Sequence, residues 1–340
     1  MTTKKANQME SLKAPYHLFL GCGDSELAIK TSRGIAQWNP DVCLGEIAGG
    51  TSTLTLGLPK MSIKVASEKG AKTFVLGLAN AGGYVDPEWV PYIVKAIECG
   101  MEVASGLHRR LDEIPEIKSA AKKHGVALHD IRHGYNDLKT GKGNKRKGKR
   151  ILAVGTDCSV GKMYTTLAIT NEMEARNFNV NFRATGQTGV MIAGSGICID
   201  AVVADFISGG IEELAPDNDD DHWDVIEGQG SLFNPAFAGV SLGLLHGSQP
   251  DIIIMCVEAG RDHIKDLPHI PIPNLKDCID LNLKCASLTN PDVKLGGISL
   301  NCRNLDAEEG KIQRKQLANK FNVPCFDPMV TGVACFVDTL

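Results

Sequence analysis

Short apolar runs alternate with amphipathic stretches along the first 150 residues. The apolar runs predict strands at 16–20, 42–47, 73–78, 101–105 and 126–130, and apolar residues at helical spacing predict helices at 89–99 and 114–124. Strands that alternate with helices favour a parallel sheet. This half of the chain is therefore expected to form a Rossmann-like α/β domain.

The second half continues the same alternation. We expect strands at 151–154, 179–184, 223–226, 251–257, 294–301 and 323–326, helices at 162–175, 196–210, 274–287 and 307–320, and a proline-bounded loop at 268–273. Residues 139–150 consist mainly of Lys, Arg and Gly, and this composition indicates a basic, solvated linker that buries nothing. The expected division is a first domain at 1–138, the linker at 139–150 and a second domain at 151–340.

The start of the second domain carries the strongest chemical signal. Strand 151–154 runs into a glycine-containing turn and then into a helix, which is the setting of a P-loop, where backbone amides and a lysine bind phosphate. The candidate phosphate-binding residues are consecutive: Gly155, Thr156, Asp157, Cys158, Ser159, Val160, Gly161, Lys162, Met163 and Tyr164. The expected fold class is thus α/β, a Rossmann-like parallel-sheet domain followed by a P-loop NTPase-like α/β domain.

The loop departs from the standard P-loop pattern at two positions. Thr156 stands where the first glycine is usual, and the letters resemble the loop of dethiobiotin synthetase. Met163 stands where nucleotide hydrolases place the hydroxyl that binds Mg²⁺, and a thioether suits that hard cation poorly. The pattern predicts phosphate binding with no required metal.

Carboxylates follow the predicted strands of this domain. Glu227 ends strand 223–226 and is a candidate base or substrate contact, with a helix cap as the alternative. Asp200 and Asp205 lie in the predicted helix 196–210, where a capping role explains Asp200 equally well and Asp205 needs a partner if it is buried.

Cationic and amide side chains complete the set of candidates. Arg183, Arg261, His108 and Arg109 could bind the carboxylates of an acidic substrate, although exposed cations are more often simply solvated. Gln187 and Thr188 lie in a loop after strand 179–184 that is expected to face the phosphate site. The thiol of Cys158, at a helix N-terminus, is expected to have a lowered pKa, but the sequence places no histidine beside it and a plain loop residue is the favoured interpretation.

Composition narrows the classes of partner. The chain has 340 residues, 43% of them hydrophobic, and a formal net charge of −4, which gives no general attraction for nucleic acid or anionic membranes. Its eleven cysteines are scattered singly, so neither a disulfide framework nor a metal site is indicated. The first residues show no apolar signal segment, and a cytoplasmic location is expected.

Several motifs together match a known family. They are the 155–166 loop with Gly-Lys-Met, Thr-Gly-Gln-Thr-Gly at 185–189, residues 200–206, Glu-Gly-Gln-Gly-Ser at 227–231, Gly82-Gly83, and Gly-Leu-His at 106–108. With these motifs the chain resembles the D-glutamate N-acetyltransferase family, a P-loop domain behind a Rossmann-like domain. The resemblance implies that the loop binds acetyl-coenzyme A, that the acceptor is the amine of a D-amino acid, chiefly D-glutamate, and that the protein is a homo-oligomer.

Under this interpretation Glu227 is the first candidate for the base, ahead of Asp200 and Asp205, and the cationic side chains named above hold the acceptor. Two other functions stay open. A Mg-ATP-dependent ligase or carboxylase like dethiobiotin synthetase requires nucleotide turnover, and a regulator that senses nucleotide or coenzyme A requires tight binding without product.

Overall fold

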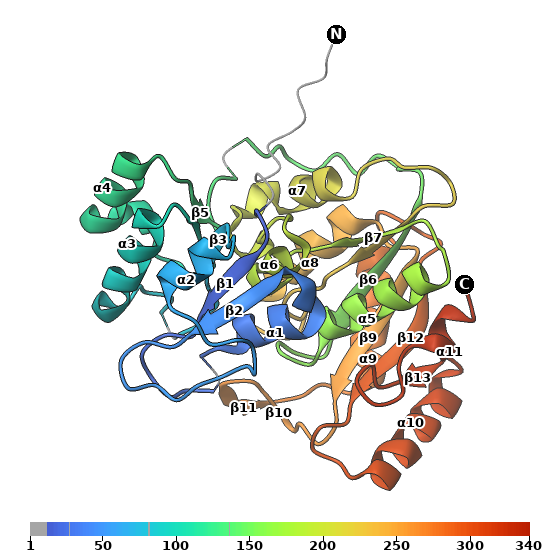
Figure 1. The fold of residues 1–340 in the computed structure, drawn as a ribbon. Helices are drawn as coiled ribbons and strands as arrows, with labels where there is room; N and C mark the ends of the chain where they lie inside the picture. The colour runs from blue at the N-terminus through green and yellow to red at the C-terminus, as the bar shows by residue number, and fades with distance from the viewer. Residues whose placement is uncertain (1–11, 27, 81, 136) are drawn as a thin grey trace. The chain divides into compact units, whose positions relative to one another are not determined.

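A computed structural model describes residues 12–26, 28–80, 82–135 and 137–340 (Figure 1). The first residues, for which no signal segment is expected, lie outside this range. The chain forms two compact units, Met1–Asn136 with Gly186–Ala201, and Asp137–Thr185 with Val202–Leu340. The segment Gly186–Ala201 thus belongs with the first unit, although the sequence pattern assigned it to the second domain.

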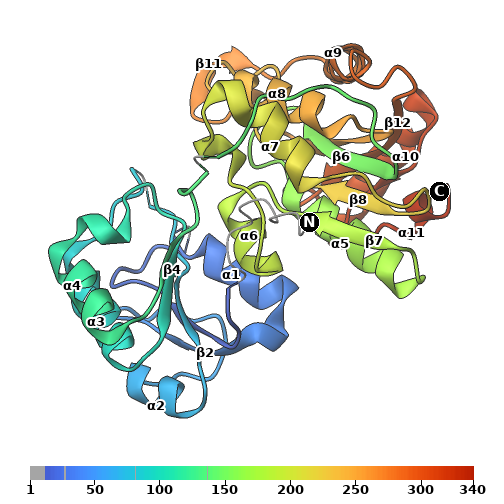
Figure 2. The same cartoon turned by 90° about the horizontal axis from the view of Figure 1, so that it is seen from above.

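The first unit is a five-stranded parallel sheet in the order β2-β1-β3-β4-β5. Figure 2 shows α1 and α6 on one face of this sheet and α2, α3 and α4 on the other. The elements are β1 (Tyr16–Phe19), α1 (Lys30–Trp38), β2 (Cys43–Ile47), α2 (Ile63–Glu68), β3 (Thr73–Leu76), α3 (Val90–Glu98), β4 (Glu102–Ser105), α4 (Pro115–His124), β5 (Leu128–Asp130) and α6 (Gln187–Ala193). All five predicted strands and both predicted helices of this unit are confirmed.

The core of the first unit forms around its central strands. Every residue of β1 and β3 is buried, because helices cover both faces of the sheet. Phe19 contacts three aromatic rings, with its centroid 5.6 Å from Phe74, 6.2 Å from Trp89 and 5.1 Å from Tyr92. The apolar runs that predicted the strands are therefore the residues that form this core.

The second unit is a six-stranded parallel sheet in the order β13-β12-β9-β6-β8-β7. Helices α7, α8 and α9 cover one face, α5 and α11 lie on the other, and α10 packs against β12 and β13 (Figure 2). The elements are β6 (Lys149–Gly155), α5 (Lys162–Ala175), β7 (Val180–Arg183), α7 (Ile207–Leu214), β8 (Trp223–Ile226), α8 (Ala238–Ser248), β9 (Ile252–Glu258), β10 (His263–Ile264), β11 (Leu267–Pro271), α9 (Leu275–Ala286), β12 (Lys294–Asn301), α10 (Ala307–Phe321), β13 (Cys325–Phe326) and α11 (Ala334–Val337). The α/β fold class with parallel sheets is confirmed.

The sequence pattern missed helices α1, α2, α6, α8 and α11, and the composition of three of them shows why. In α1 the buried positions include Thr31, Ser32 and Gly34, so no apolar stripe marks the helix. Helix α6 is only seven residues long, and α8 contains three glycines and is apolar nearly all round. Hydrophobic periodicity detects a helix by a face of large apolar residues, whereas the buried face of α1 consists mostly of small and polar residues and α8 is apolar on nearly all sides.

Two predicted segments differ from the structure. The predicted helix 196–210 is in fact two short 3₁₀ turns, Ile199–Ala201 and Ala204–Phe206, followed by α7. The predicted loop 268–273 lies largely in β11, which pairs antiparallel with β10 in a small hairpin. Proline is tolerated there because a two-stranded sheet consists of edge strands alone.

Residues 139–145 are exposed, as expected for a linker, but the expectation that the whole stretch 139–150 buries nothing is wrong. Strand β6 already begins at Lys149, and the side chains of Arg146 and Arg150 are buried. The guanidinium of Arg146 donates to the carbonyls of Glu212 and Ala215, at the end of α7, and of Gly247, near the end of α8. Burial, with the charge of Arg150 second, lowers the pKa of Arg146 to about 10. A guanidinium can cap two helix C-termini at once, because it carries five donors and a positive charge.

We expect Arg146→Met to lower the free energy of unfolding by about 3 kcal/mol, since the carbonyls at the ends of α7 and α8 lose their buried donors. Urea denaturation followed by circular dichroism measures the change. Lys145→Met is the control, because this neighbouring side chain is exposed. Equal stability of the two variants would contradict the capping role.

Among the described residues, no helix combines the length and the apolar character needed to cross a membrane.

Candidate functional site

The carboxyl edge of the second sheet has a topological switch point beside β6. The chain leaves β6 for β7 and β8 on one side and later returns to β9 on the other, so the loops after β6 and β9 are neighbours. Ligands of parallel α/β sheets bind in the crevice at such a point. The P-loop follows β6, and the loop that carries Arg261 follows β9.

The backbone of the P-loop has the shape that phosphate binding needs. Ser159 and Gly161 have positive φ angles, 57° and 107°. Gly161 is also the N-cap of α5 and has no side chain to occupy the first amides of that helix. Lys162 folds back on the loop, where its Nζ donates to the carbonyl of Asp157 at 2.7 Å, and burial lowers the pKa of Lys162. A buried lysine beside uncapped helix amides has the chemistry that anion binding requires.

Asp157 supplies the carboxylate of the loop and has 0% of its surface exposed. Its Oδ1 accepts from Asn234 Nδ2 at 3.0 Å, and its Oδ2 accepts from Arg261 at 2.9 Å and from the amide of Lys265 at 2.6 Å. Although burial alone works to raise the pKa of Asp157, hydrogen bonds from Asn234, the amides of Lys265 and Cys158, and Arg261 hold that pKa below its ordinary value. Asp157 is therefore an ionised hydrogen-bond acceptor within the loop.

Arg261 extends this cluster to the end of β9. Its guanidinium donates to Asp157, to the carbonyl of Cys158 at 2.7 Å and to the carboxylate of Glu258. Glu258 in turn accepts from Arg303 and from Asn304 Nδ2 at 3.3 Å, both in the loop after β12. The buried carboxylates of Asp157 and Glu258 thus connect the loops that follow β6, β8, β9 and β12.

Glu227 ends up beside the P-loop lysine. It follows β8, is 4% exposed, and is close enough for its charge to act on Lys162. Its Oε2 accepts from the amide of Thr185 at 2.9 Å, and its carbonyl accepts from the Thr185 hydroxyl at 2.6 Å. Gln229 Nε2 donates to the same hydroxyl at 3.3 Å. The carboxylate is thereby held in a fixed orientation beside the P-loop.

The other candidates of the second unit have different surroundings. Arg183 Nε donates to buried Asp224 at 2.6 Å, and His222 shares the same carboxylate oxygen at 3.2 Å. Asp205 is exposed and lies in a 3₁₀ turn, so it does not need the buried partner that its apolar neighbours suggested. Burial raises the pKa of Cys158, and the expected lowering of that pKa is wrong because desolvation outweighs the nearby Lys162 charge. Throughout the described ranges, His, Cys, Asp and Glu side chains form no group of three or more suited to a metal ion.

The remaining candidates lie in the first unit. His108 and Arg109 follow β4, where the loop of Gly83 packs against them: the Arg109 amide donates to the Gly83 carbonyl at 2.9 Å. Asp200 pairs with Arg132, whose Nε also donates to the Gly106 carbonyl at 2.7 Å. Burial and the charge of Arg132 lower the pKa of His108.

The Gln187 and Thr188 pair, expected in a loop, begins helix α6 of the first unit. Thr188 forms a hydrogen bond with Thr31 at 3.1 Å, and the Gln187 side chain packs against Gly106 so closely that a Cβ there would be 2.1 Å from Oε1. Both residues therefore have defined structural contacts within their own unit.

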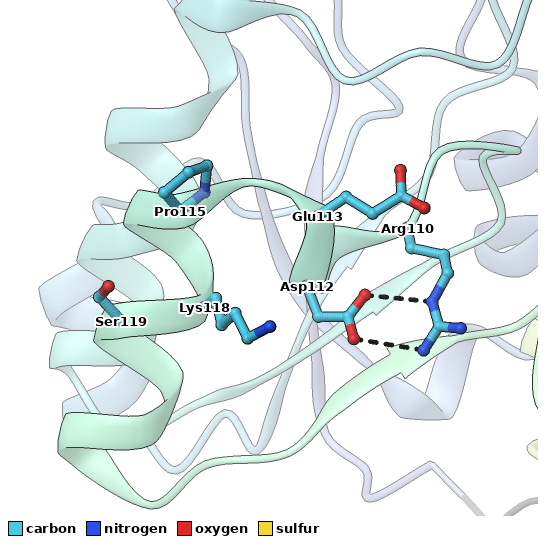
Figure 3. A pocket seen from close by; sticks show the side chains of 6 residues that line it. All are labelled: Arg110, Asp112, Glu113, Pro115, Lys118 and Ser119. Carbon is cyan, nitrogen blue, oxygen red and sulfur yellow. Dashed lines mark hydrogen bonds and ion pairs between the residues drawn. The ribbon is translucent and has the colours of Figure 1, made fainter.

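A shallow hollow beside α4 lies on the surface of the first unit (Figure 3). Arg110 forms two hydrogen bonds with Asp112, at 3.1 and 3.2 Å, so the two charges compensate each other. In Figure 3 the Lys118 side chain extends toward Asp112, and the Glu113 side chain extends away from Lys118. Nothing in this hollow points to a particular ligand.

Some residues of the site gave no signal in the sequence. No motif in the sequence marks Asn234, Lys265 or Arg132, and only the fold brings each of them beside a charged candidate. Hydrogen-bond partners across a sheet edge are not encoded by spacing along the chain.

A P-loop α/β unit and a five-stranded parallel α/β unit define the class of this protein. Family models agree: a domain of unknown function described as a Rossmann-like domain matches residues 45–134, and its P-loop counterpart matches residues 137–337. The chain belongs to this DUF1611 family.

Full-length relatives carry a functional name. A D-glutamate N-acetyltransferase from Pseudoalteromonas sp is 50% identical over 97% of this chain and 99% of its own length, and one from Tritonibacter scottomollicae is 46% identical over the same shares. A crystal structure of a DUF1611 family protein from Anabaena variabilis ATCC 29413 is 30% identical and superposes with a TM-score of 0.84, covering 96% of this chain and 98% of that chain. The predicted family is confirmed.

Proposed function

We propose that this protein is an acyltransferase that transfers the acetyl group of acetyl-coenzyme A to the amine of D-glutamate. The observation that carries the proposal is the pair of relatives at 50% and 46% identity, both D-glutamate N-acetyltransferases by name and matched over nearly their whole length. At such identity and coverage the whole scaffold is shared, and the site discussed above is the part of it with suitable chemistry.

The donor is assigned to the P-loop on chemical grounds. Coenzyme A carries a pyrophosphate, and the loop offers helix N-terminal amides together with the buried ammonium of Lys162. The thioether of Met163, at the usual Mg²⁺-ligand position, favours binding of phosphates over metal-assisted phosphoryl transfer. These features support a donor that is bound through its phosphates and reacts at a different group, the thioester.

Glu227 is assigned as the base. The acceptor amine is protonated at neutral pH and cannot attack until a proton leaves its nitrogen. In the proposed step the Glu227 carboxylate takes that proton, the amine nitrogen forms a bond to the thioester carbonyl carbon, and the carbon–sulfur bond breaks as the thiolate of coenzyme A leaves. The second proton of the nitrogen passes to the departing thiolate as the amide forms, so the products are N-acetyl-D-glutamate and the free thiol of coenzyme A.

Product mass spectrometry tests the proposal. The enzyme is incubated with acetyl-coenzyme A and either D- or L-glutamate, in EDTA and without nucleotide. N-acetyl-D-glutamate from the D isomer alone is the expected result. Mass detection is preferred to thiol reagents, because the protein has eleven cysteines of its own.

A panel of other D-amino acids shows the breadth of the acceptor site. Absence of any acetylated product across the panel, with turnover that appears only when Mg-ATP is added, would overturn the acetyltransferase proposal in favour of a ligase.

A further inference from the structure

We propose that Arg261 is a positioning residue that sets the P-loop through the buried carboxylate of Asp157, and that it does not bind the carboxylates of the acceptor. The kinetic part of this inference rests on the proposed function, and a binding measurement given below does not. Arg261 stood among the candidates for acceptor binding because it follows a strand at the edge of the site.

The charge of Arg261 is already matched within the protein. Its side chain is 15% exposed and pairs with two carboxylates, Asp157 and Glu258, that are 0% and 2% exposed. A third carboxylate brought to the same guanidinium would face two negative charges in a poorly solvated place. The local electrostatics therefore disfavour an acidic substrate at Arg261.

The same guanidinium fixes the direction of the loop backbone. It donates to the carbonyl of Cys158 at 2.7 Å and lies 3.5 Å from that of Ser159. In a trans peptide the N–H points opposite to the preceding carbonyl. When these two carbonyls turn toward Arg261, the amides of Ser159 and Val160 turn the other way, which leaves them available to a phosphate on the far side of the loop.

Ser159 also needs such support. It is a non-glycine residue at φ 57°, a backbone conformation that L residues rarely adopt without surrounding restraints. Lys265 Nζ lies 3.3 Å from the Ser159 hydroxyl, while the amide of Lys265 donates to Asp157. The β10–β11 hairpin and Arg261 thus hold the loop from one side through the same carboxylate.

Arg261→Lys is the first test. The lysine keeps the charge but has no planar fork to reach Asp157, Glu258 and the Cys158 carbonyl together. We expect the KM for acetyl-coenzyme A to rise about tenfold or more, with kcat and the KM for D-glutamate within about twofold of wild type. A raised KM for D-glutamate with an unchanged KM for acetyl-coenzyme A would overturn the proposal.

Arg176→Lys is the matched control. Arg176 lies at the other end of α5, and its guanidinium also pairs with two carboxylates, those of Glu172 and Asp338. This variant should leave both KM values unchanged. If it raises the KM for acetyl-coenzyme A as much as Arg261→Lys does, the effect is one of general stability and the proposal fails.

A double-mutant cycle identifies the path of the effect. Asp157→Asn keeps the size of the side chain but removes the charge that Arg261 pairs with. If Arg261 acts through Asp157, Arg261→Lys should change the KM for acetyl-coenzyme A much less in the Asp157→Asn variant than in wild type. Additive effects of the two substitutions would contradict the proposed path. If Arg261→Lys does not fold, Asp157→Asn alone tests the proposal, because it should also raise the KM for acetyl-coenzyme A and leave the KM for D-glutamate unchanged.

Calorimetric titration with inorganic pyrophosphate separates this inference from the proposed function. The wild-type P-loop should bind the probe, Arg261→Lys should bind it about tenfold more weakly, and Arg176→Lys should match wild type. If the wild-type protein does not use acetyl-coenzyme A but binds pyrophosphate, and Arg261→Lys loses that binding, the proposed donor is refuted and the positioning role is supported. Full activity and undiminished pyrophosphate binding in Arg261→Lys would refute the positioning role and leave the donor intact.

Discussion

Glu227→Gln is expected to lower kcat for acetyl transfer about 10²- to 10⁴-fold, the usual contribution of a positioned general base. The amide keeps the size of the carboxylate and can still accept from the Thr185 amide, now at 2.9 Å, so the loop should remain in place. What the variant lacks is the ability to take a proton from the acceptor ammonium. Steady-state kinetics from pH 6 to pH 10 measure the effect, and the loss should shrink at high pH, where more of the acceptor amine is free.

Glu212→Gln is the control for this substitution. Glu212 is another carboxylate of the second unit that accepts from backbone amides, those of Lys142 and Gly143, and it lies in α7 rather than at the P-loop. It should retain wild-type kcat. Full turnover of Glu227→Gln at both neutral and alkaline pH would remove Glu227 as the base.

The order of elements could be predicted largely because the two sheets are parallel and covered on both faces. Strands in this position are uninterrupted apolar runs, and β8 and β12 were predicted with their observed bounds. The misassigned segments have another physical origin. Arg146 and Arg150 look like a solvated stretch by composition, but they become buried because helix ends and loops offer them carbonyl acceptors. A composition rich in Lys and Arg indicates exposure, because burying a cation is costly, but it does not show whether the fold supplies acceptors that offset this cost.

The P-loop could be located from the sequence because its chemistry is local. A strand, a turn, a lysine and a helix follow each other within some twenty-five residues, so letters and spacing carry most of the information. The surroundings of the loop are not local. Asp157 meets Asn234, Arg261 and Lys265 only when the loops after β8 and β9 fold beside it, about 75 to 110 positions further along the chain. Contacts of this kind have no periodic signature, and one sequence cannot reveal them.

The difference between the local P-loop motif and its distant contacts separates residues that could bind a ligand from residues that support the loop. In the proposed function Lys162 and the loop amides bind the phosphates of the donor, whereas the carboxylates of Asp157 and Glu258 accept hydrogen bonds from other residues of the protein. Charged residues near a P-loop therefore need not all contact a substrate. The buried ones make the loop rigid, and rigidity is what lets a cradle of amides bind phosphates without reorganising.

Gly228→Ala is expected to disrupt the site and to cost more than about 4 kcal/mol of stability, the range reached when backbone must move in a packed core. A Cβ on Gly228 would lie 1.6 Å from the carbonyl oxygen of Ala153, in the strand that leads into the P-loop, and 3.0 Å from Cδ of Lys162. Strands β6 and β8 would have to separate at the point where Glu227 and Lys162 approach each other. Thermal unfolding and pyrophosphate titration measure the two effects. Gly239→Ala is the control: it lies in helix α8, and the added Cβ would have no neighbouring atom within 4 Å, so this variant should unfold at or slightly above the wild-type temperature. If Gly228→Ala were as stable as this control and still bound pyrophosphate, the two strands would not be packed as closely as described.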